Sequence, residues 1–324
     1  MIKGVHGLKE NDVTKAGSID FDTAHIAHQL AGVAGVEVKT DKMIAPHTSY
    51  KIGGPAAVWA APSSEDGIGE VLAIVRAAGM PLFILGLGSN LLVSDKGWPG
   101  VILYLGTNFS GWRYDGTTAV VMAGTRLLDL IRDAVDRGLG GMELMAGIPG
   151  SVGGALRMNA GAFGQEIEQT TVKVKGFQMD GSSFEAGRNK INFRYRRVPE
   201  LERVVITSGQ FRFKKTAAGI LKKRMDNILA LRAQKQPLDS PSCGSVFKRP
   251  PGYYAGALIE EAGMKGERVG DAMVSPKHAG FILNTGNAKA ADVFSLICRI
   301  EQRVWDRFGV KLEREIKLVG EFDD

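Results

Sequence analysis

Residues 146–164 read AGIPGSVGGALRMNAGAFG and form the densest glycine stretch of the chain. Glycine has no Cβ, so the backbone N–H groups of such a stretch can approach a pyrophosphate closely. The alternative is a structural loop without a ligand, and for one isolated run the two interpretations carry about equal weight. The stretch therefore predicts a phosphate-binding loop only if other runs of the same kind accompany it.

Two further glycine runs do accompany it. Residues 47–54 read HTSYKIGG, and residues 86–90 read GLGSN. The run at 86–90 lies between the apolar segments 82–85 and 91–93, both expected strands, so it does not open a helix as the Rossmann fingerprint requires. Leu91 also stands where that fingerprint has its third glycine. Three runs in one region favour a large dinucleotide, flavin or nicotinamide, bound by a fold other than the Rossmann fold.

Hydrophobic periodicity outlines mixed helices and strands on both sides of these runs. Apolar residues at helical spacing predict helices at 65–78, 125–136 and 290–308. A short helix is expected at 22–30, and a basic helix at 222–236, which Pro237 ends. Short apolar or alternating segments predict strands at 56–61, 82–85, 91–93, 101–105, 119–123, 171–177, 203–213 and 280–284. The main domain boundary is expected at residues 215–220.

Composition narrows the class of protein. An apolar share of 44% and a charged share of 23% are typical of a globular chain, and the absence of an 18-residue apolar run or a signal-peptide pattern predicts a cytoplasmic protein without a membrane partner. The net charge of +6 suits an anionic ligand, but the basic residues are scattered, which does not favour nucleic acid. Two cysteines, Cys243 and Cys298, predict neither a disulfide framework nor a metal site. The motifs of P-loop ATPases, zincins and α/β-hydrolases are absent.

Several polar residues could carry chemistry. The segment 240–248, SPSCGSVFK, sets small hydroxyl residues beside a cation, and its ordinary interpretation is a solvated loop. Serine is a weak acid, so a catalytic Ser245 would need a strongly basic carbanion as its proton acceptor. Three arginines surround Tyr195 in the segment 194–197. The segment is interpreted either as a solvated strand edge or as a fork that binds a carboxylate or phosphate. His47 and His278 are candidate bases or hydrogen-bonded structural residues.

Residues 312–318, LEREIKL, alternate in the manner of a strand. Successive side chains of a strand point to opposite faces, so Glu313 and Glu315 would share the face opposite the apolar residues. The ordinary expectation for both is a surface carboxylate.

Five segments, in this order, are similar to those of the UDP-N-acetylenolpyruvoylglucosamine reductase (MurB) family. The resemblance covers residues 40–322 and matches the shorter variant, which lacks the loop whose tyrosine caps the substrate. The segments are HTSYKIGGPA at 47–56, GLGSNLLV at 86–93, the stretch 146–164, GSVFK at 244–248, and LEREIKLVG at 312–320.

The resemblance implies an α+β fold. A two-subdomain FAD-binding unit of the vanillyl-alcohol-oxidase (PCMH) type would span residues 41–215, and a smaller α+β substrate-binding domain would span residues 216–324. Residues 1–40 would form an N-terminal leader with one helix. A monomer is expected.

The resemblance also implies the chemistry. The family takes hydride from NADPH onto non-covalently bound FAD, passes it to C3 of UDP-N-acetylglucosamine enolpyruvate, and protonates C2 to give UDP-N-acetylmuramate for peptidoglycan precursor synthesis. By motif, Ser245 is the proton donor, Arg196 the partner of the substrate carboxylate, and Glu315 the other catalytic residue. Ser245 would thus face the basic carbanion that serine chemistry requires.

Further binding residues follow from the same motifs. Those implied for the substrate are Tyr195, Lys235 and Lys248. Those implied for FAD are Tyr50, Lys51, Ile52, Gly53, Gly54, Gly86, Gly88, Ser89, Asn90, Leu91, Ala146, Gly147, Ile148, Pro149, Gly150, Ser151, Gly153, Gly154, Asn159 and Gly161.

The sequence departs from the family pattern at two positions near the expected site. Arg249 stands where an asparagine is usual, and Val198 where a serine is usual. Two alternative functions remain open on this fold: an FAD-linked oxidase that uses oxygen and another sugar, and a non-catalytic nucleotide-sugar sensor.

Overall fold

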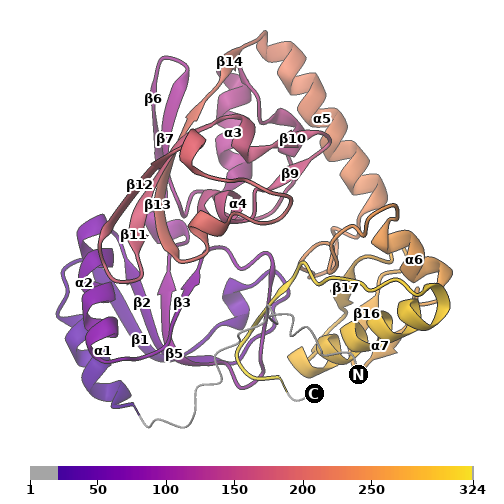
Figure 1. The fold of residues 1–324 in the computed structure, drawn as a ribbon, viewed down its shortest axis with the longest axis horizontal. Helices are drawn as coiled ribbons and strands as arrows, with labels where there is room; N and C mark the ends of the chain where they lie inside the picture. The colour runs from indigo at the N-terminus through magenta and orange to yellow at the C-terminus, as the bar shows by residue number, and fades with distance from the viewer. Residues whose placement is uncertain (1–20, 323–324) are drawn as a thin grey trace, which may run out of the picture.

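The computed structural model describes residues 21–322, and it divides into three parts (Figure 1). The first part is a four-stranded sheet in the order β1-β2-β5-β3, in which β1 runs antiparallel to β2 and the other pairs are parallel. Its strands are β1 (Val36–Met43), β2 (Pro55–Pro62), β3 (Leu82–Leu85) and β5 (Trp98–Tyr104).

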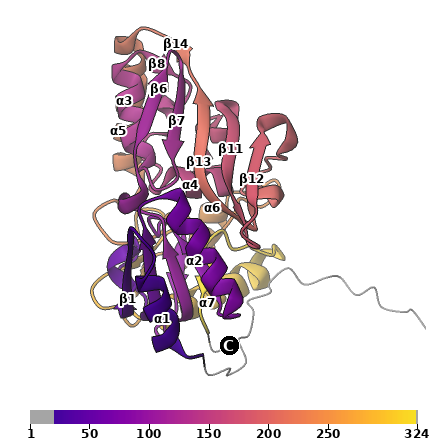
Figure 2. The same ribbon diagram turned by 90° about the vertical axis from the view of Figure 1, so that its left-hand side faces the viewer.

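Helices α1 (Thr23–Ala31) and α2 (Glu65–Ala77) pack side by side on this sheet (Figure 2). Asp22 and Ser64 cap their N-termini by accepting hydrogen bonds from backbone amides of the first turn. The apolar stripes of both helices enter one core with β2 and β5. Residues 36–43 form one continuous strand of this sheet, so the predicted boundary between residues 40 and 41 falls inside β1. Of the predicted leader, residues 1–20 lie outside the described residues.

The second part is a five-stranded antiparallel sheet in the order β12-β11-β13-β7-β6. Helices α3 (Leu127–Asp136) and α4 (Val152–Arg157) cover one face of it and share its core. Its strands are β6 (Trp112–Asp115), β7 (Thr118–Met122), β11 (Thr171–Gln178), β12 (Ser183–Gly187) and β13 (Val204–Arg212). Two short ladders flank it, β8 (Leu139–Gly140) with β14 (Lys214–Lys215) and β9 (Gly161–Ala162) with β10 (Gln165–Glu166).

Helix α5 (Ala218–Lys235) leads from the second part to the third (Figure 1). The third part packs α6 (Ala255–Glu261) and α7 (Ala290–Phe308) with a small sheet of β15 (Arg268–Val269), β16 (Ala272–Val274) and β17 (Ile282–Asn284). Short 3-10 turns lie at Ala45–His47, Thr107–Phe109, Glu143–Met145, Ile167–Gln169, Arg188–Lys190 and Pro199–Leu201.

The chain returns from the third part to the first at its C-terminal end. Strand β18 (Lys317–Val319) pairs in parallel with β4 (Leu91–Val93). The carboxylate of Asp95, just after β4, accepts hydrogen bonds from the amides of Ala290 and Ala291 at the start of α7 (2.8 and 3.1 Å). These contacts hold the third part against the strand that follows the GLGSN run.

The predicted strand at 312–318 is only partly correct. The ladder covers Lys317–Val319 alone, and residues 312–316 run between the first and third parts. The amide of Glu315 donates to the carbonyl of Val246 (2.8 Å), and its side chain is 17% exposed, against 70% for Glu313. The two glutamates therefore do not share a solvent face, because this segment lies in a cleft rather than at a sheet surface.

None of the helices between residues 21 and 322 is long and apolar enough to cross a membrane. Within the same residues, no group of three or more His, Cys, Asp or Glu side chains could hold a metal ion.

A buried carboxylate ties α5 to the second part. Glu143 is 3% exposed and accepts hydrogen bonds from the amide of Gly141 (2.7 Å) and from Nη1 of Arg224 (3.2 Å). Burial raises the pKa of Glu143, but the hydrogen bonds from Gly141, Gln165 and Arg224 together outweigh it, so its pKa lies below 4.5.

We expect Glu143→Gln to lower the free energy of unfolding by about 1–3 kcal/mol at pH 7, because a charge-assisted acceptor is lost in a buried site. A carboxyl with a lowered folded pKa stabilises the protein above its unfolded pKa and loses this effect as the pH falls through the folded pKa. The difference between variant and wild type in urea unfolding should therefore shrink below pH 4.5. A difference that stays constant from pH 7 to below pH 4 would contradict this explanation. Glu185→Gln, at an exposed ion pair with Lys173, is the control.

Candidate active site

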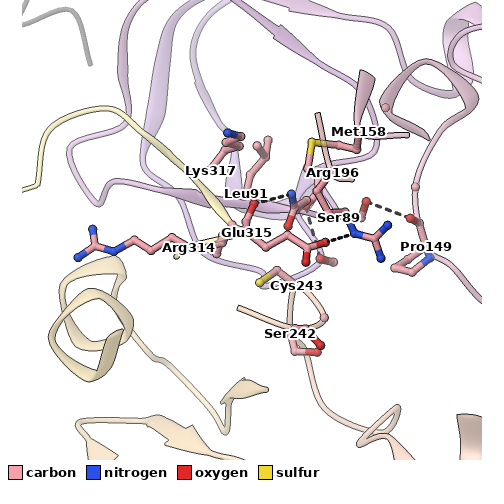
Figure 3. Close-up of a pocket in the computed structure, with 18 of the residues that line it drawn as sticks. Ser89, Leu91, Pro149, Met158, Arg196, Ser242, Cys243, Arg314, Glu315 and Lys317 are labelled. Atoms are coloured by element: carbon pink, nitrogen blue, oxygen red, sulfur yellow. Dashed lines mark hydrogen bonds and ion pairs between the residues drawn. The ribbon is translucent and has the colours of Figure 1, made fainter. Parts of the chain in front are cut away.

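One cleft of about 3860 Å³ lies where the three parts of the fold meet. Both the 86–91 run and the 147–154 run line it, together with the turn at 195–197, the loop 236–249 and the segment 311–318. Figure 3 shows part of this cleft, with Glu315 directed at Arg196 and Arg314 directed away from it. Segments predicted separately from the sequence are thus brought to one place.

The two glycine runs contact each other across the cleft. The hydroxyl of Ser89 donates to the carbonyl of Pro149 (3.2 Å; Figure 3). A Cβ at Gly150 would lie 2.6 Å from the Ser89 hydroxyl, and one at Gly86 would lie 2.6 Å from the Ser151 hydroxyl. Among residues 21–322, no group accepts a hydrogen bond from the backbone amides at 87–90. The runs therefore form a close-packed cradle with free amide donors, which suits phosphate oxygens.

A two-residue turn presents Tyr195 and Arg196 to the cleft. Arg194 and Arg197 exchange backbone hydrogen bonds across the turn (2.8 and 3.2 Å). Arg196 itself has φ +55°, in the left-handed region that non-glycine residues rarely adopt. The buried amide of Asn159 donates to the carbonyl of Arg194 (3.4 Å) and steadies the turn. Backbone strain of this kind is commonly kept at functional sites.

Arg196 and Glu315 form an ion pair inside the cleft. Nε of Arg196 lies 2.7 Å from Oε1 of Glu315, and Nη2 donates to the carbonyl of Gly161 (3.1 Å). The two side chains are only 20% and 17% exposed. Burial raises the pKa of Glu315 above its usual value, although the charge and hydrogen bond of Arg196 oppose this. Glu315 is thus a carboxyl that holds a proton more readily than a surface glutamate.

Backbone contacts place Ser245 beside the Arg196–Glu315 pair. Its neighbour Val246 accepts the amide of Glu315, and Ser245 forms an isolated bridge with Phe281. Gly244, with φ +82°, makes the turn that exposes Ser245 to the cleft. Within the described part of the chain, no group forms a hydrogen bond with the Ser245 hydroxyl, so it is available to a ligand. Burial raises the pKa of nearby Cys243 to about 12, which makes that thiol inert.

Two family models match the chain, an FAD-binding domain at residues 55–187 and the C-terminal domain of UDP-N-acetylenolpyruvoylglucosamine reductase at residues 236–319. A UDP-N-acetylenolpyruvoylglucosamine reductase of Oceanobacillus iheyensis is 40% identical over 302 residues, which cover 92% of this chain and 97% of that protein. The chain belongs to the UDP-N-acetylenolpyruvoylglucosamine reductase family.

Two further members of the reductase family are similar to this chain over most of its length. UDP-N-acetylenolpyruvoylglucosamine reductase 2 of Bacillus anthracis is 41% identical over 285 residues, covering 88% of this chain and 93% of that protein. The crystal structure of the Thermus caldophilus enzyme is 34% identical with a TM-score of 0.74, and the match covers 88% of this chain and 99% of that one. The predicted α+β fold with its vanillyl-alcohol-oxidase-type FAD-binding unit is confirmed, and the chain is a flavin oxidoreductase with FAD as cofactor.

The residues present fit FAD. The glycines of the cradle leave open the space that a Cβ would fill. The free backbone amides of the cradle can donate hydrogen bonds to the oxygens of a pyrophosphate. Of the residues predicted for FAD, those that line the cleft are Lys51, Gly86, Gly88, Ser89, Asn90, Leu91, Gly147, Ile148, Pro149, Gly150, Ser151, Gly153, Gly154 and Gly161.

Six of the residues predicted for FAD do not line the cleft: Tyr50, Ile52, Gly53, Gly54, Ala146 and Asn159. Two of them, Gly54 and Asn159, support loops of the cleft. A Cβ at Gly54 would lie 2.2 Å from the carbonyl of Asp95, so this glycine allows two loops to pack. Asn159 is 1% exposed, and its side-chain amide donates hydrogen bonds to the carbonyl of Arg194 and to Oε2 of Glu166 (2.9 Å).

Of the residues predicted for the substrate, Tyr195 and Lys248 line the cleft, whereas Lys235 is exposed on α5 and does not. Lys248 pairs with Glu313. One helical turn before Lys235, Arg232 does line the cleft and is buried. Sequence reasoning missed Arg232, although its position continues the buried stripe Leu221, Met225, Ile228 of α5, where a charged residue is anomalous.

The two residues that depart from the family pattern, Val198 and Arg249, lie in different surroundings. Val198 is fully buried in the core of the second part. Arg249 is exposed in the cleft, with its guanidinium carbon 4.0 Å from the ring centre of Tyr254. Of the two candidate bases, His278 lines the cleft and His47 does not, and burial lowers the pKa of both imidazoles.

The cradle can be tested by adding a methyl group. Gly88 has φ +60°, and its Cβ would lie 2.3 Å from the carbonyl of His47. Relief of this clash has to displace the 86–90 loop from its place in the cradle, at an overpacking cost of about 1–3 kcal/mol. We therefore expect Gly88→Ala to weaken FAD binding about 10- to 100-fold. Quenching of flavin fluorescence by the apoprotein measures the dissociation constant.

Gly116→Ala is the matched control for this substitution. Gly116 has φ +58°, nearly the same backbone conformation, but nothing lies within 4 Å of its Cβ. The alanine therefore meets the same backbone strain without the clash. Equal losses of FAD affinity in the two variants would show that the clash at the cradle is irrelevant.

Proposed function

We propose that the chain reduces UDP-N-acetylglucosamine enolpyruvate to UDP-N-acetylmuramate, with NADPH as hydride donor and FAD as carrier. Family membership supports this substrate and its place in peptidoglycan precursor synthesis. The observation that carries the mechanism is the Arg196–Glu315 pair beside Ser245, opposite the glycine cradle. We also propose a division at residues 215/216, between the two segments matched by the family models.

When bound, FAD supplies hydride transfer, from NADPH and then to C3 of the enolpyruvyl group. Addition at C3 leaves negative charge at C2 that delocalises into the adjacent carboxylate. Arg196, fixed by Glu315 and the carbonyl of Gly161, offers its guanidinium to that carboxylate. A preoriented cation stabilises developing charge without reorganising during the reaction.

Ser245 completes the reaction by giving its hydroxyl proton to C2. The hydroxyl is free of protein partners in the described chain, so nothing competes for the proton. The serine then recovers a proton from solvent, and the substrate has gained one hydride and one proton. Tyr195 and Lys248 at the cleft wall are proposed to contact the substrate, whose two phosphates require basic partners.

An absorption spectrum followed by an anaerobic titration tests the proposal. The purified protein should be yellow, bleach on addition of NADPH, and regain its colour when UDP-N-acetylglucosamine enolpyruvate is added. Bleaching without recovery, together with rapid peroxide formation in air, would overturn the reductase in favour of an FAD-linked oxidase. A flavin that NADPH leaves oxidised would instead indicate a nucleotide-sugar sensor.

A further inference from the structure

Arg232 is a buried cation on a helix face that is otherwise apolar. It follows Leu221, Met225 and Ile228 on the inner stripe of α5 and is 9% exposed. Its side chain lines the cleft between the glycine loop at 147–150 and the turn at 195–197. Fully buried arginines are rare unless a partner neutralises them.

The described residues hold no such partner for Arg232. The contacts of the guanidinium are a long hydrogen bond from Nη1 to Oε1 of Gln236 (3.4 Å) and the ring of Phe163 at 5.6 Å. Among residues 21–322, no group forms a hydrogen bond with Nε, and no carboxylate lies within ion-pair distance of Arg232. Burial, and after it the charge of Arg196, lower the pKa of Arg232. A buried charge in this state costs several kcal/mol.

The surroundings accommodate Arg232 rather than exclude it. A Cβ at Gly147 would lie 2.7 Å from Cδ of Arg232 and 3.2 Å from its Nε, so a glycine is needed at 147 for the side chain to lie where it does. The C-terminal end of α5 also carries a partial negative charge that favours a cation in its last turn. The fold therefore keeps this guanidinium in the cleft at a cost in free energy.

The charges of the cleft explain why the fold keeps the Arg232 guanidinium there. Arg196 is already neutralised by Glu315 at 2.7 Å, so a carboxylate that approaches Arg196 also meets the negative charge of Glu315. The three side chains Arg196, Glu315 and Arg232 together carry one net positive charge. That charge belongs to Arg232, which has no carboxylate partner among residues 21–322.

We propose that Arg232 binds a singly charged, delocalised anion in the cleft beside Arg196. The planar guanidinium fork matches such an anion, and its two sources are the carboxylate of the substrate and the negative charge that two-electron reduction places on the flavin. This assignment rests on the proposed function. It makes Arg232 a source of positive charge beside Arg196 that Glu315 does not neutralise.

The test compares Arg232→Gln and Arg232→Lys with Lys223→Gln, which removes a charge from an exposed position of the same helix. The first measurement is the affinity of the oxidised holoenzyme for UDP-N-acetylmuramate and for UDP-N-acetylglucosamine, which lacks the carboxylate. The second is the midpoint potential of the bound flavin without nucleotide sugar. The third is thermal unfolding of the apoprotein.

If the anion is the carboxylate, Arg232→Gln weakens UDP-N-acetylmuramate binding about 10- to 100-fold, as expected for a hydrogen bond to a charged group, and leaves UDP-N-acetylglucosamine binding unchanged. If it is the reduced flavin, the potential falls by about 30–60 mV, since a tenfold change is about 30 mV for two electrons. In both cases Arg232→Lys retains part of the effect, and the Arg232→Gln apoprotein is at least as stable as wild type.

Affinities and potential that match those of Lys223→Gln would overturn the proposal. So would an Arg232→Gln apoprotein that unfolds at a lower temperature, because it would show a structural contact rather than an unpaired charge. Failure of the proposed function would give a different set of results. A wild-type holoenzyme that binds neither nucleotide sugar would reject the reductase, while the potential and the apoprotein stability would still report on Arg232.

Discussion

Ser245→Ala should leave the reduction of bound flavin by NADPH nearly unchanged and slow reoxidation by the enolpyruvyl substrate about 10²- to 10⁴-fold, the usual contribution of a general acid. The proton is needed only after hydride reaches C3, so the loss belongs to the second half-reaction alone. Anaerobic stopped-flow absorbance of the flavin measures both halves separately. Ser242→Ala, three residues earlier in the same loop, should behave as wild type in both.

Two further results bear on the role of Ser245. A cysteine at this position is a stronger acid than serine, so Ser245→Cys should recover part of the rate. The wild-type second half-reaction should also slow in D₂O. Equal losses in the two half-reactions of Ser245→Ala would contradict a proton donor and indicate a residue that shapes the cleft.

Arg196→Gln should lower the rate of the second half-reaction about 10²- to 10³-fold, the cost of removing one preorganised group that stabilises developing charge. The variant also leaves Glu315 without the cation that opposes its burial, so the pKa of Glu315 should rise further. A double variant with Glu315→Gln should lose less than the sum of the single losses, because the two side chains act as a unit.

The shift in Glu315 has a stability signature with a definite sign. A carboxyl with a raised folded pKa binds more protons in the native state than in the unfolded state, so the free energy of unfolding falls as the pH rises above 4.5. This fall should be steeper in Arg196→Gln than in wild type and absent from the double variant. Urea unfolding of the apoproteins between pH 4 and pH 8 measures it. Arg188→Gln, at a more exposed ion pair, is the control, and an identical slope in both variants would contradict the coupling.

Local features of the chain were predictable because they depend on neighbouring residues. The predicted bounds of β3, β4 and α7 are those of the structure, since short apolar runs and helical spacing are read within one element. The prediction that the 86–90 run lies between two strands, and not before a helix, is also confirmed. Helix α5 begins at residue 218, four residues before the predicted start, because its first turn lacks a capping signal.

The ordered motifs by themselves determined the family and the cofactor, because glycine runs and the GSVFK and LEREI segments are recognised without coordinates. Only the tertiary structure decided which side chains share the cleft. Strand alternation alone made Glu315 an ordinary surface carboxylate, and only the family motif implied a catalytic role. The return of β18 to β4 and the hydrogen bond from the Glu315 amide to the carbonyl of Val246 place its side chain against Arg196. Arg232 lines the cleft and Lys235 does not, because burial depends on parts of the chain that meet only after folding.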